Sequence, residues 1–302
     1  MTDLLSIFAS DIFPIFAIAG AGYLLARFVG ANVKTVSHVV FYVATPCLVF
    51  TLLTTTARTA SGMGRVVLAA VLMMIAMGCV GLIAGAALRL SRPDLRAFLI
   101  VVMFSNVGNF GLPVLQFAFG AEALAYGSVF FLTFSAMTYT IGAYIAAGAH
   151  GTASAAFWRV LKMPALYGVA AALVVIATGV TVPVAVMRPV SLMSDAALPL
   201  MILVLGMQLE RAVWPARPVA AVCAVMVSLV VAPIVALGLT WLLDVPEPAR
   251  QAAVTMSAMP AAVANTILAL EFDLDPNFVT STVFLSTMAS PLTLTPLIAY
   301  LR

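Results

Sequence analysis

Two asparagines, two glycines and one proline lie within the eight residues 106–113, in an apolar stretch that carries no charge between Arg96 and Glu122. From position 105 to 113 the stretch reads Ser-Asn-Val-Gly-Asn-Phe-Gly-Leu-Pro. Glycine and proline oppose a continuous helix, so this pattern predicts a helix that breaks and then resumes. The amide groups of Asn106 and Asn109 can donate hydrogen bonds to a carboxylate without placing a charge in apolar surroundings. The stretch is therefore a candidate anion site.

A second apolar stretch has the same character around Pro260, and from 257 to 266 it reads Ser-Ala-Met-Pro-Ala-Ala-Val-Ala-Asn-Thr. Asn265 supplies its amide group. We expect Pro113 and Pro260 each to lie in the first turn of a second half-helix, where the missing N–H does no harm. The N-terminus of such a half-helix carries about half a positive charge and free N–H groups, which can bind an anion.

Amide groups and helix N-termini are the groups left to hold an anion, because none of the 14 basic residues lies at the centre of an apolar stretch. Pro46, which follows Thr45, and Pro199 are a second symmetric pair of prolines, which either kink their spans or open backbone carbonyls to the same cavity. The substrate that these groups favour is a small carboxylate, although amides equally coordinate water or sodium. The candidate substrate-binding residues are Asn106, Asn109, Pro113, Pro260, Asn265, Thr45 and Pro46.

The composition predicts that these stretches lie in a membrane. Of the 302 residues, 64% are hydrophobic and 8% are charged, against roughly 45–50% and about 25% in soluble domains. Lipid must therefore replace the missing polar exterior, and the chain is predicted to be an all-α polytopic membrane protein. Stretches of about 20 apolar residues span a bilayer. Ten are predicted, at 4–26, 35–56, 66–88, 95–119, 123–147, 163–180, 189–209, 218–243, 250–270 and 277–300.

The distribution of basic residues predicts the orientation. Nine Lys and Arg residues lie on one predicted face and five on the other, and the richer face is expected in the cytoplasm. Both termini then lie on the extracytoplasmic side of the cell (inner) membrane, and the chain crosses it many times. The five are Arg58, Arg65, Arg188, Arg250 and Arg302.

An internal repeat indicates how the ten spans are organised. At an offset of about 153 residues, Ser-Val-Phe-Phe-Leu-Thr at 128–133 falls on Ser-Thr-Val-Phe-Leu-Ser at 281–286. Because each repeat contains an odd number of spans, five, the second copy enters the membrane from the opposite side, as in many secondary transporters. The predicted organisation is a first five-helix repeat at 1–149, a short cytoplasmic link at 150–162 and an inverted second repeat at 163–302.

Few titratable groups lie deep in the predicted spans. Asp195 lies about six residues inside the seventh span, so it is a candidate for coupling transport to a proton or a cation, with an interfacial position beside Arg188 as the alternative. For Asp11, near the start of the first span, we expect an interfacial position rather than a coupling role. The three cysteines are far apart and there are two histidines, so we expect no metal site, no cofactor and no nucleic-acid partner.

Three segments together resemble the auxin efflux carrier family: the run at 105–113, Ala-Thr-Pro-Cys-Leu-Val-Phe at 44–50, and Met-Pro-Ala-Ala-Val-Ala-Asn at 259–265. That family includes plant PIN-type auxin exporters and bacterial permeases for malate and malonate. The resemblance covers essentially the whole chain. The short link at 150–162 is similar to the bacterial members rather than to the plant exporters, which carry a long regulatory loop there.

The resemblance implies ten helices in two inverted five-helix repeats, related in fold to the bile-acid sodium symporters. It also implies that spans four and nine cross at their breaks in a transport domain, while spans one, two, six and seven form a scaffold. The family's crossover residues map onto Asn109, Pro113 and Pro260. The implied activity is alternating-access transport of organic anions; substrate identity and ion coupling stay open, as does assembly into a homodimer.

Three other functions fit the sequence less well. A ten-helix drug/metabolite exporter also has inverted five-helix repeats, but it is not expected to contain two symmetric proline-broken helices. A channel needs a ring of charged or carbonyl groups, which the sequence does not display. An intramembrane enzyme needs a buried acid pair, a Ser/His pair or a metal site, so we expect no enzyme activity.

Overall fold

The computed structural model describes residues 2–56, 62–146, 161–210, 215 and 217–302. Regular structure in these residues is helical, apart from a single β-bridge. Within the described ranges, seven helical segments are long and apolar enough to cross a membrane, at Leu4–Val29, Val33–Thr55, Met63–Ala87, Val107–Ala146, Val184–Leu209, Pro218–Leu242 and Pro276–Leu301. The prediction of a helical polytopic membrane protein is confirmed. The predicted link at 150–162 lies outside the described residues except at its last two positions.

The first half of the chain contains three long apolar helices and one broken helix. The elements are α1 (Thr2–Ile7), η1 (Phe8–Ile12), α2 (Phe13–Leu24), η2 (Leu25–Val29), α3 (Val33–Val39), η3 (Val40–Ala44), α4 (Thr45–Thr56), α5 (Met63–Ala87), α6 (Arg92–Met103), η5 (Val107–Gly111), α7 (Leu112–Met137), η6 (Thr138–Gly142) and α8 (Ala143–Ala146). Elements labelled η are π-helical turns.

The second half has a similar sequence of elements. They are α10 (Pro164–Thr178), α11 (Val184–Leu209), α12 (Pro218–Met226), η7 (Val227–Val231), α13 (Ala232–Leu242), α14 (Ala249–Ser257), α15 (Ala264–Glu271) and α16 (Pro276–Leu301). α10 is apolar but has only 15 residues, and α14 and α15 are shorter still. Seven segments therefore meet the length of a span, and the count of ten stays a prediction.

Four prolines explain most of the π-helical turns. Because proline has no N–H, the carbonyl four residues earlier loses its α-helical partner, and a wider turn accommodates the ring. In each of these four cases the π-helical turn ends two residues before the proline. The pairs are η1 with Pro14, η3 with Pro46, η5 with Pro113 and η7 with Pro233.

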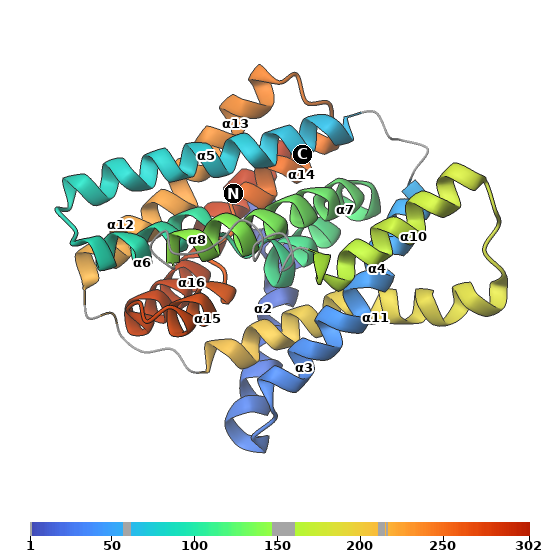
Figure 1. The fold of residues 1–302 in the computed structure, drawn as a ribbon, viewed down its shortest axis with the longest axis horizontal. Coiled ribbons are helices and arrows are strands. Elements are labelled where there is room, and N and C mark those ends of the chain that lie inside the picture. The colour runs from blue at the N-terminus through green and yellow to red at the C-terminus, as the bar shows by residue number, and fades with distance from the viewer. Residues whose placement is uncertain (1, 57–61, 147–160, 211–214, 216) are drawn as a thin grey trace.

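The helices form two groups (Figure 1). In the first helix group, α2 packs on α11 and α4 packs on both α10 and α11. In the second helix group, α5 packs on α6, α7 and α13, while α14 packs on α7 and α13. η5 contacts α11, so the break between α6 and α7 lies where the two groups meet.

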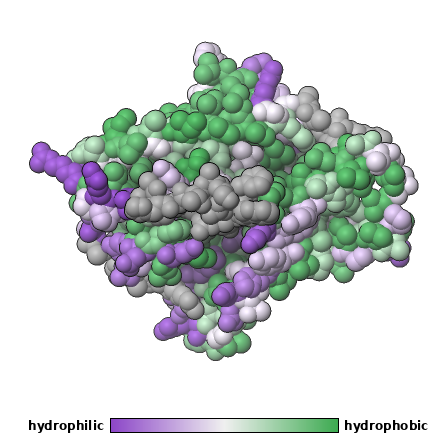
Figure 2. All heavy atoms as spheres, viewed as in Figure 1, coloured by the Kyte–Doolittle hydropathy of each residue, from purple (hydrophilic) through white to green (hydrophobic). Residues whose placement is uncertain are grey.

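Glycines allow close contact inside the first helix group. A side chain at Gly22 would overlap the backbone of Leu203, and one at Gly206 would overlap the backbone of Ala19. Small residues at such contacts are typical of helix packing in membranes. The outer surface is apolar over much of the face in Figure 2, and the large apolar side chains of Trp241, Leu292 and Phe28 are more than three-quarters exposed. This surface suits contact with lipid.

Candidate functional site

The two non-helical segments predicted from the sequence lie against each other. The first, Phe104–Asn106, separates α6 from η5, and the second, 258–263, separates α14 from α15. The Asn106 N–H donates to the Pro260 carbonyl at 2.7 Å, and the Ala262 N–H donates to the Phe104 carbonyl at 2.9 Å. These bonds form an antiparallel bridge between Ser105 and Ala261. Buried backbone groups need partners, and each break supplies them to the other.

Two side chains hold the paired segments in place. Asn265 is fully buried on α15, and its Nδ2 donates to the Phe104 carbonyl at 2.8 Å. The Ser286 hydroxyl on α16 accepts a hydrogen bond from the Ala261 N–H at 3.2 Å. The amide of Asn265 therefore bonds to the backbone across the break. Asn265 does not line the cavity that lies beside the two segments and is described below.

Pro113 lies in the first turn of α7, as predicted, but the π-helical turn η5 precedes α7 without a gap. Helical structure after the first break already begins at Val107 in η5, with Asn106 at the N-cap, so Pro113 lies six residues into a continuous helix. Helical bonding can begin earlier because the π-turn bonds, such as Gly111 N–H to the Asn106 carbonyl at 2.9 Å, do not require a donor at Pro113.

Pro260 lies before the second half-helix and not in it, because α15 begins at Ala264. Its carbonyl accepts the hydrogen bond from Asn106, so it contributes to the pairing of the two segments. Pro113 and Pro260 are both buried, and neither lines the cavity described next. The prediction that both prolines begin a half-helix is therefore wrong for Pro260, whereas Pro113 lies in the first turn of α7.

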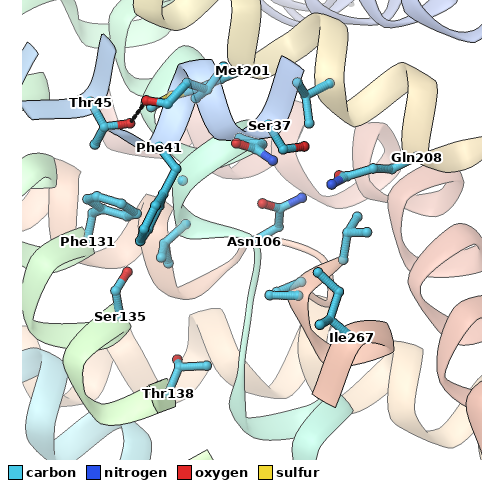
Figure 3. Close-up of a pocket in the computed structure, with 18 of the residues that line it drawn as sticks. Ser37, Phe41, Thr45, Asn106, Phe131, Ser135, Thr138, Met201, Gln208 and Ile267 are labelled. Atoms are coloured by element: carbon cyan, nitrogen blue, oxygen red, sulfur yellow. Dashed lines mark hydrogen bonds between the residues drawn. The ribbon is translucent and has the colours of Figure 1, made fainter. Parts of the chain in front are cut away.

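A cavity of about 350 Å³ lies beside the paired segments, between η3, η5, α7, α11 and the start of α15 (Figure 3). Asn106, Asn109 and Thr45 line it, as the sequence predicts for a site. No Lys or Arg is among the lining residues that the structure describes. Further lining residues are Ser37, His38, Val40, Phe41, Tyr42, Ser105, Val107, Gly108, Phe131, Ser135, Thr138, Met201, Val204, Gln208, Ala262, Val263, Ala264 and Ile267.

Two amide atoms at this cavity are buried without a hydrogen-bond partner in the structure. They are Nδ2 of Asn106, a donor, and Oε1 of Gln208, an acceptor. Asn106 is 5% exposed. In Figure 3 the two side chains point toward one another across the cavity. The Thr45 hydroxyl differs from them, because it already donates to the Val40 carbonyl at 2.8 Å.

The N-termini of two helices also lie at this cavity. Gly108 and Asn109 are in the first turn of the helix that begins at Val107, and Ala264 begins α15. The first N–H groups of a helix have no carbonyl partner within the helix, and the dipole makes this end partly positive. The cavity therefore offers N–H donors and positive potential without a charged side chain, which suits a small anion.

Three other predicted residues are not brought to the cavity. Pro46 packs against Gly168 of α10, where a side chain on the glycine would overlap the Pro46 backbone. Asp195 is exposed on α11 and lines neither this cavity nor a second, larger one of about 580 Å³ between α2, α11 and α16. Asn265 supports the break, as described above.

The buried acid of the described structure is Asp11, for which an interfacial position was predicted. Asp11 is 3% exposed and pairs with Arg302 at 2.5 Å, and it accepts a hydrogen bond from the Ser10 hydroxyl at 2.7 Å. Arg302 also donates to the Ala118 carbonyl at 3.1 Å. The sequence offers one signal for this pair: Asp11 and Arg302 lie near the two chain ends, which were both predicted on the same face of the membrane.

Gln208 was not identified as a site residue from the sequence. The signal that could have found it is an uncharged amide near the end of an apolar stretch.

Comparison with known proteins agrees with this architecture. The family model described as "Membrane transport protein" matches residues 7–298. The chain is 28% identical over 267 residues to an uncharacterized transporter of Methanothermobacter thermautotrophicus, and 22% identical over 266 residues to an uncharacterized transporter of Methanocaldococcus jannaschii, with 86% of each chain covered in both cases. The chain therefore belongs to this membrane transport protein family, the auxin efflux carrier family.

Proposed function

We propose that this protein is a secondary transporter of small organic anions and that it binds their carboxylate in the cavity beside the paired non-helical segments. The observation that carries the proposal is the meeting of two helix N-termini and an unpartnered Asn106 amide at one cavity whose described lining includes no Lys or Arg. Asn109 lies in the first turn of the helix that begins at Val107, and it supplies a second amide to the cavity. The uncharged lining attracts an anion and still allows it to leave, as transport requires.

We further propose ten spans in two inverted repeats, with spans four and nine crossing at their breaks. Gly120, at φ 78° and ψ −167°, interrupts α7 at the predicted end of the fourth span. A side chain at Gly127 would overlap Leu115, so the two parts of α7 pack on each other as separate helices would. α7 therefore supports two spans.

Ion pairs at the helix ends support the repeat. Arg217, before α12, pairs with Asp94 at the start of α6, while Arg65, at the start of α5, bonds to Asp244 before α14. Arg65 and Arg217 lie 152 residues apart, close to the repeat offset. The two pairs thus join corresponding helices of the two halves.

The lining of the cavity indicates an inward-facing state under the proposed orientation. Ser37, His38 and Gln208 lie near the helix ends that carry Arg27 and Lys34, the predicted cytoplasmic face. The Asp11–Arg302 pair lies toward the opposite face. In alternating access, the cavity would next open toward that opposite face.

The family match favours a carrier over the drug/metabolite exporter, the channel and the enzyme that are the alternatives from the sequence.

The test is counterflow of radiolabelled carboxylates in proteoliposomes that contain the purified protein. A panel of mono- and dicarboxylates is compared with cationic and neutral solutes, each with and without sodium and pH gradients. We expect saturable exchange of carboxylates and none of the cations. Exchange of cations alone, or flux that does not saturate, would overturn the proposal.

Asp195 is our proposed coupling residue, tested in the same vesicles. Asp195→Asn should remove the dependence of uptake on a proton or sodium gradient while leaving substrate exchange more nearly intact. If the wild-type protein shows no gradient dependence, Asp195 has no coupling role.

A further inference from the structure

The side chain of Gln208 needs a hydrogen-bond donor that a simple carboxylate does not provide. Its Oε1 is buried at the cavity and has no hydrogen-bond partner in the structure, and it can only accept a hydrogen bond. A carboxylate cannot satisfy it, because an ionised carboxylate also only accepts. A buried acceptor left without a donor is unfavourable by an amount comparable to a lost hydrogen bond.

We propose that Gln208 determines specificity by accepting a hydrogen bond from a hydroxyl or N–H group of the transported acid. This inference rests on the proposed function, because it assumes that the Asn106 amide holds the carboxylate. Asn106 offers the donor and Gln208 the acceptor, and the two side chains face each other across the cavity (Figure 3). One molecule that carries a carboxylate and a nearby donor satisfies both.

The rest of the lining limits the size and polarity of that molecule. Phe41, Phe131, Met201 and Ile267 give the cavity apolar walls. A volume of about 350 Å³ lies at the lower end of ligand sites. The substrate class is therefore a small acid with a hydroxyl or N–H group close to the carboxylate and an apolar remainder.

The position of Gln208 gives this contact a second consequence. Gln208 belongs to α11 in the first helix group, whereas Asn106 lies in the break that joins α6 to η5 beside the second helix group. A molecule bonded to both amides contacts both helix groups at once. An acid without the donor leaves the Gln208 amide oxygen unpaired and makes no hydrogen bond to the first helix group through it.

The test measures dissociation constants by calorimetry for two matched pairs of acids on the purified full chain: lactate against propionate, and mandelate against phenylacetate. We expect the hydroxylated acid of each pair to bind at least about tenfold more tightly. In Gln208→Met, which keeps an unbranched side chain of similar length, this ratio should fall close to one. Gln116→Met is the matched control, because Gln116 lies on α7 and lines neither cavity, and it should keep the ratio.

The outcomes separate this inference from the proposed function. If none of the four acids binds, the carboxylate site itself is wrong and the inference fails with it. If all four bind and the hydroxyl has no effect in the wild-type protein, the inference is overturned and the carboxylate site stands. A hydroxyl preference that persists in Gln208→Met also overturns it. Because each ratio compares two acids on one protein sample, partial loss of folded Gln208→Met does not obscure the result.

Discussion

The two non-helical segments look alike in sequence but use their asparagines differently. Asn106, in the first segment, directs its amide to the cavity, and Nδ2 has no partner there. Asn265, just after the second segment, donates its Nδ2 to the Phe104 carbonyl and lines no part of that cavity. A polar residue beside a helix break can therefore serve either a ligand or the backbone of the break itself.

This difference follows from what each segment leaves unpaired. Breaking α6 frees the Phe104 carbonyl in the protein interior, where it needs donors, and it receives them from Ala262 and Asn265. The second segment thus supplies the donors that close the first. Asn106 receives backbone pairing from Pro260, so its side chain is free to bind a solute. We expect one asparagine to support the fold and the other to support binding.

Asn265→Ala should give the largest effect, on stability. It removes the buried hydrogen bond of Nδ2 and leaves a small void, and these losses outweigh the removal of Oδ1, which is buried without a partner, so we expect a loss of about 3 kcal/mol in the free energy of unfolding. Thermal unfolding of the purified protein in detergent measures this as a lower midpoint. Asn277→Ala, at an exposed position in α16, is the matched control and should change little. A midpoint for Asn265→Ala equal to that of the control would show that the amide does not brace the break.

Asn106→Ala should instead weaken binding while the fold is retained. Removal of the donor to a buried carboxylate is expected to cost about 2 kcal/mol of affinity, or roughly 30-fold in the dissociation constant. The midpoint of unfolding should stay the same or rise, since the variant no longer buries an unpartnered donor. Calorimetry and thermal unfolding on one preparation measure both quantities. A drop in stability as large as that of Asn265→Ala would erase the contrast between the two segments.

Asn109→Ala should weaken carboxylate binding less than Asn106→Ala. Asn109 lines the same cavity but is only half-buried, so water partly replaces its contact, and we expect about 1 kcal/mol, or several-fold. The same calorimetric titration provides the comparison. Unchanged affinity in the folded variant would remove Asn109 from the site.

Asp94→Asn should have the smallest effect, because it acts at the start of α6 far from the break. Burial opposes ionisation of Asp94, but hydrogen bonds from Arg217 and Ser91 and the charge of Arg217 outweigh it and lower its pKa. The pair is partly exposed, so we expect less than about 1 kcal/mol of stability.

The pH dependence of this difference has a definite sign. A pKa that is lower in the folded protein gives stability that is present above about pH 4 and is lost as the pH falls through the folded pKa. The gap between wild type and Asp94→Asn should therefore close in acid. A gap that widens below pH 4 would contradict the assigned pairing.

The sequence predicted the breaks well because their cause is local. Glycine, asparagine and proline near 105–113 and 257–266 oppose a helix whatever surrounds them, and the chain is non-helical at 104–106 and at 258–263. The starting residues of the half-helices were less predictable, because the π-turn before Pro113 moves the helix start back to Val107. Periodicity alone does not distinguish an α-turn from a π-turn.

The partners of polar side chains could not be predicted from local sequence. Asp11 and Arg302 are 291 residues apart, and their pairing depends on how the first and last helices pack. Gln208 faces the cavity and Asp195 faces outward, although both lie on α11. Hydropathy identifies an apolar helix but not which of its faces contacts a cavity, so the depth of Asp195 in the sequence did not place it at the site.

Substrate protection of introduced cysteines tests the central claim, that carboxylate binds in the cavity beside the paired segments. In a background with Cys47, Cys79 and Cys223 replaced by alanine, Ser135→Cys and Ala262→Cys place a thiol at the cavity, and Met259→Cys places one at a fully buried position outside it. We predict that a small water-soluble thiol reagent labels positions 135 and 262 and that a transported carboxylate slows this labelling, while position 259 stays unlabelled. Labelling at 135 and 262 that a saturating carboxylate leaves unchanged would contradict the account.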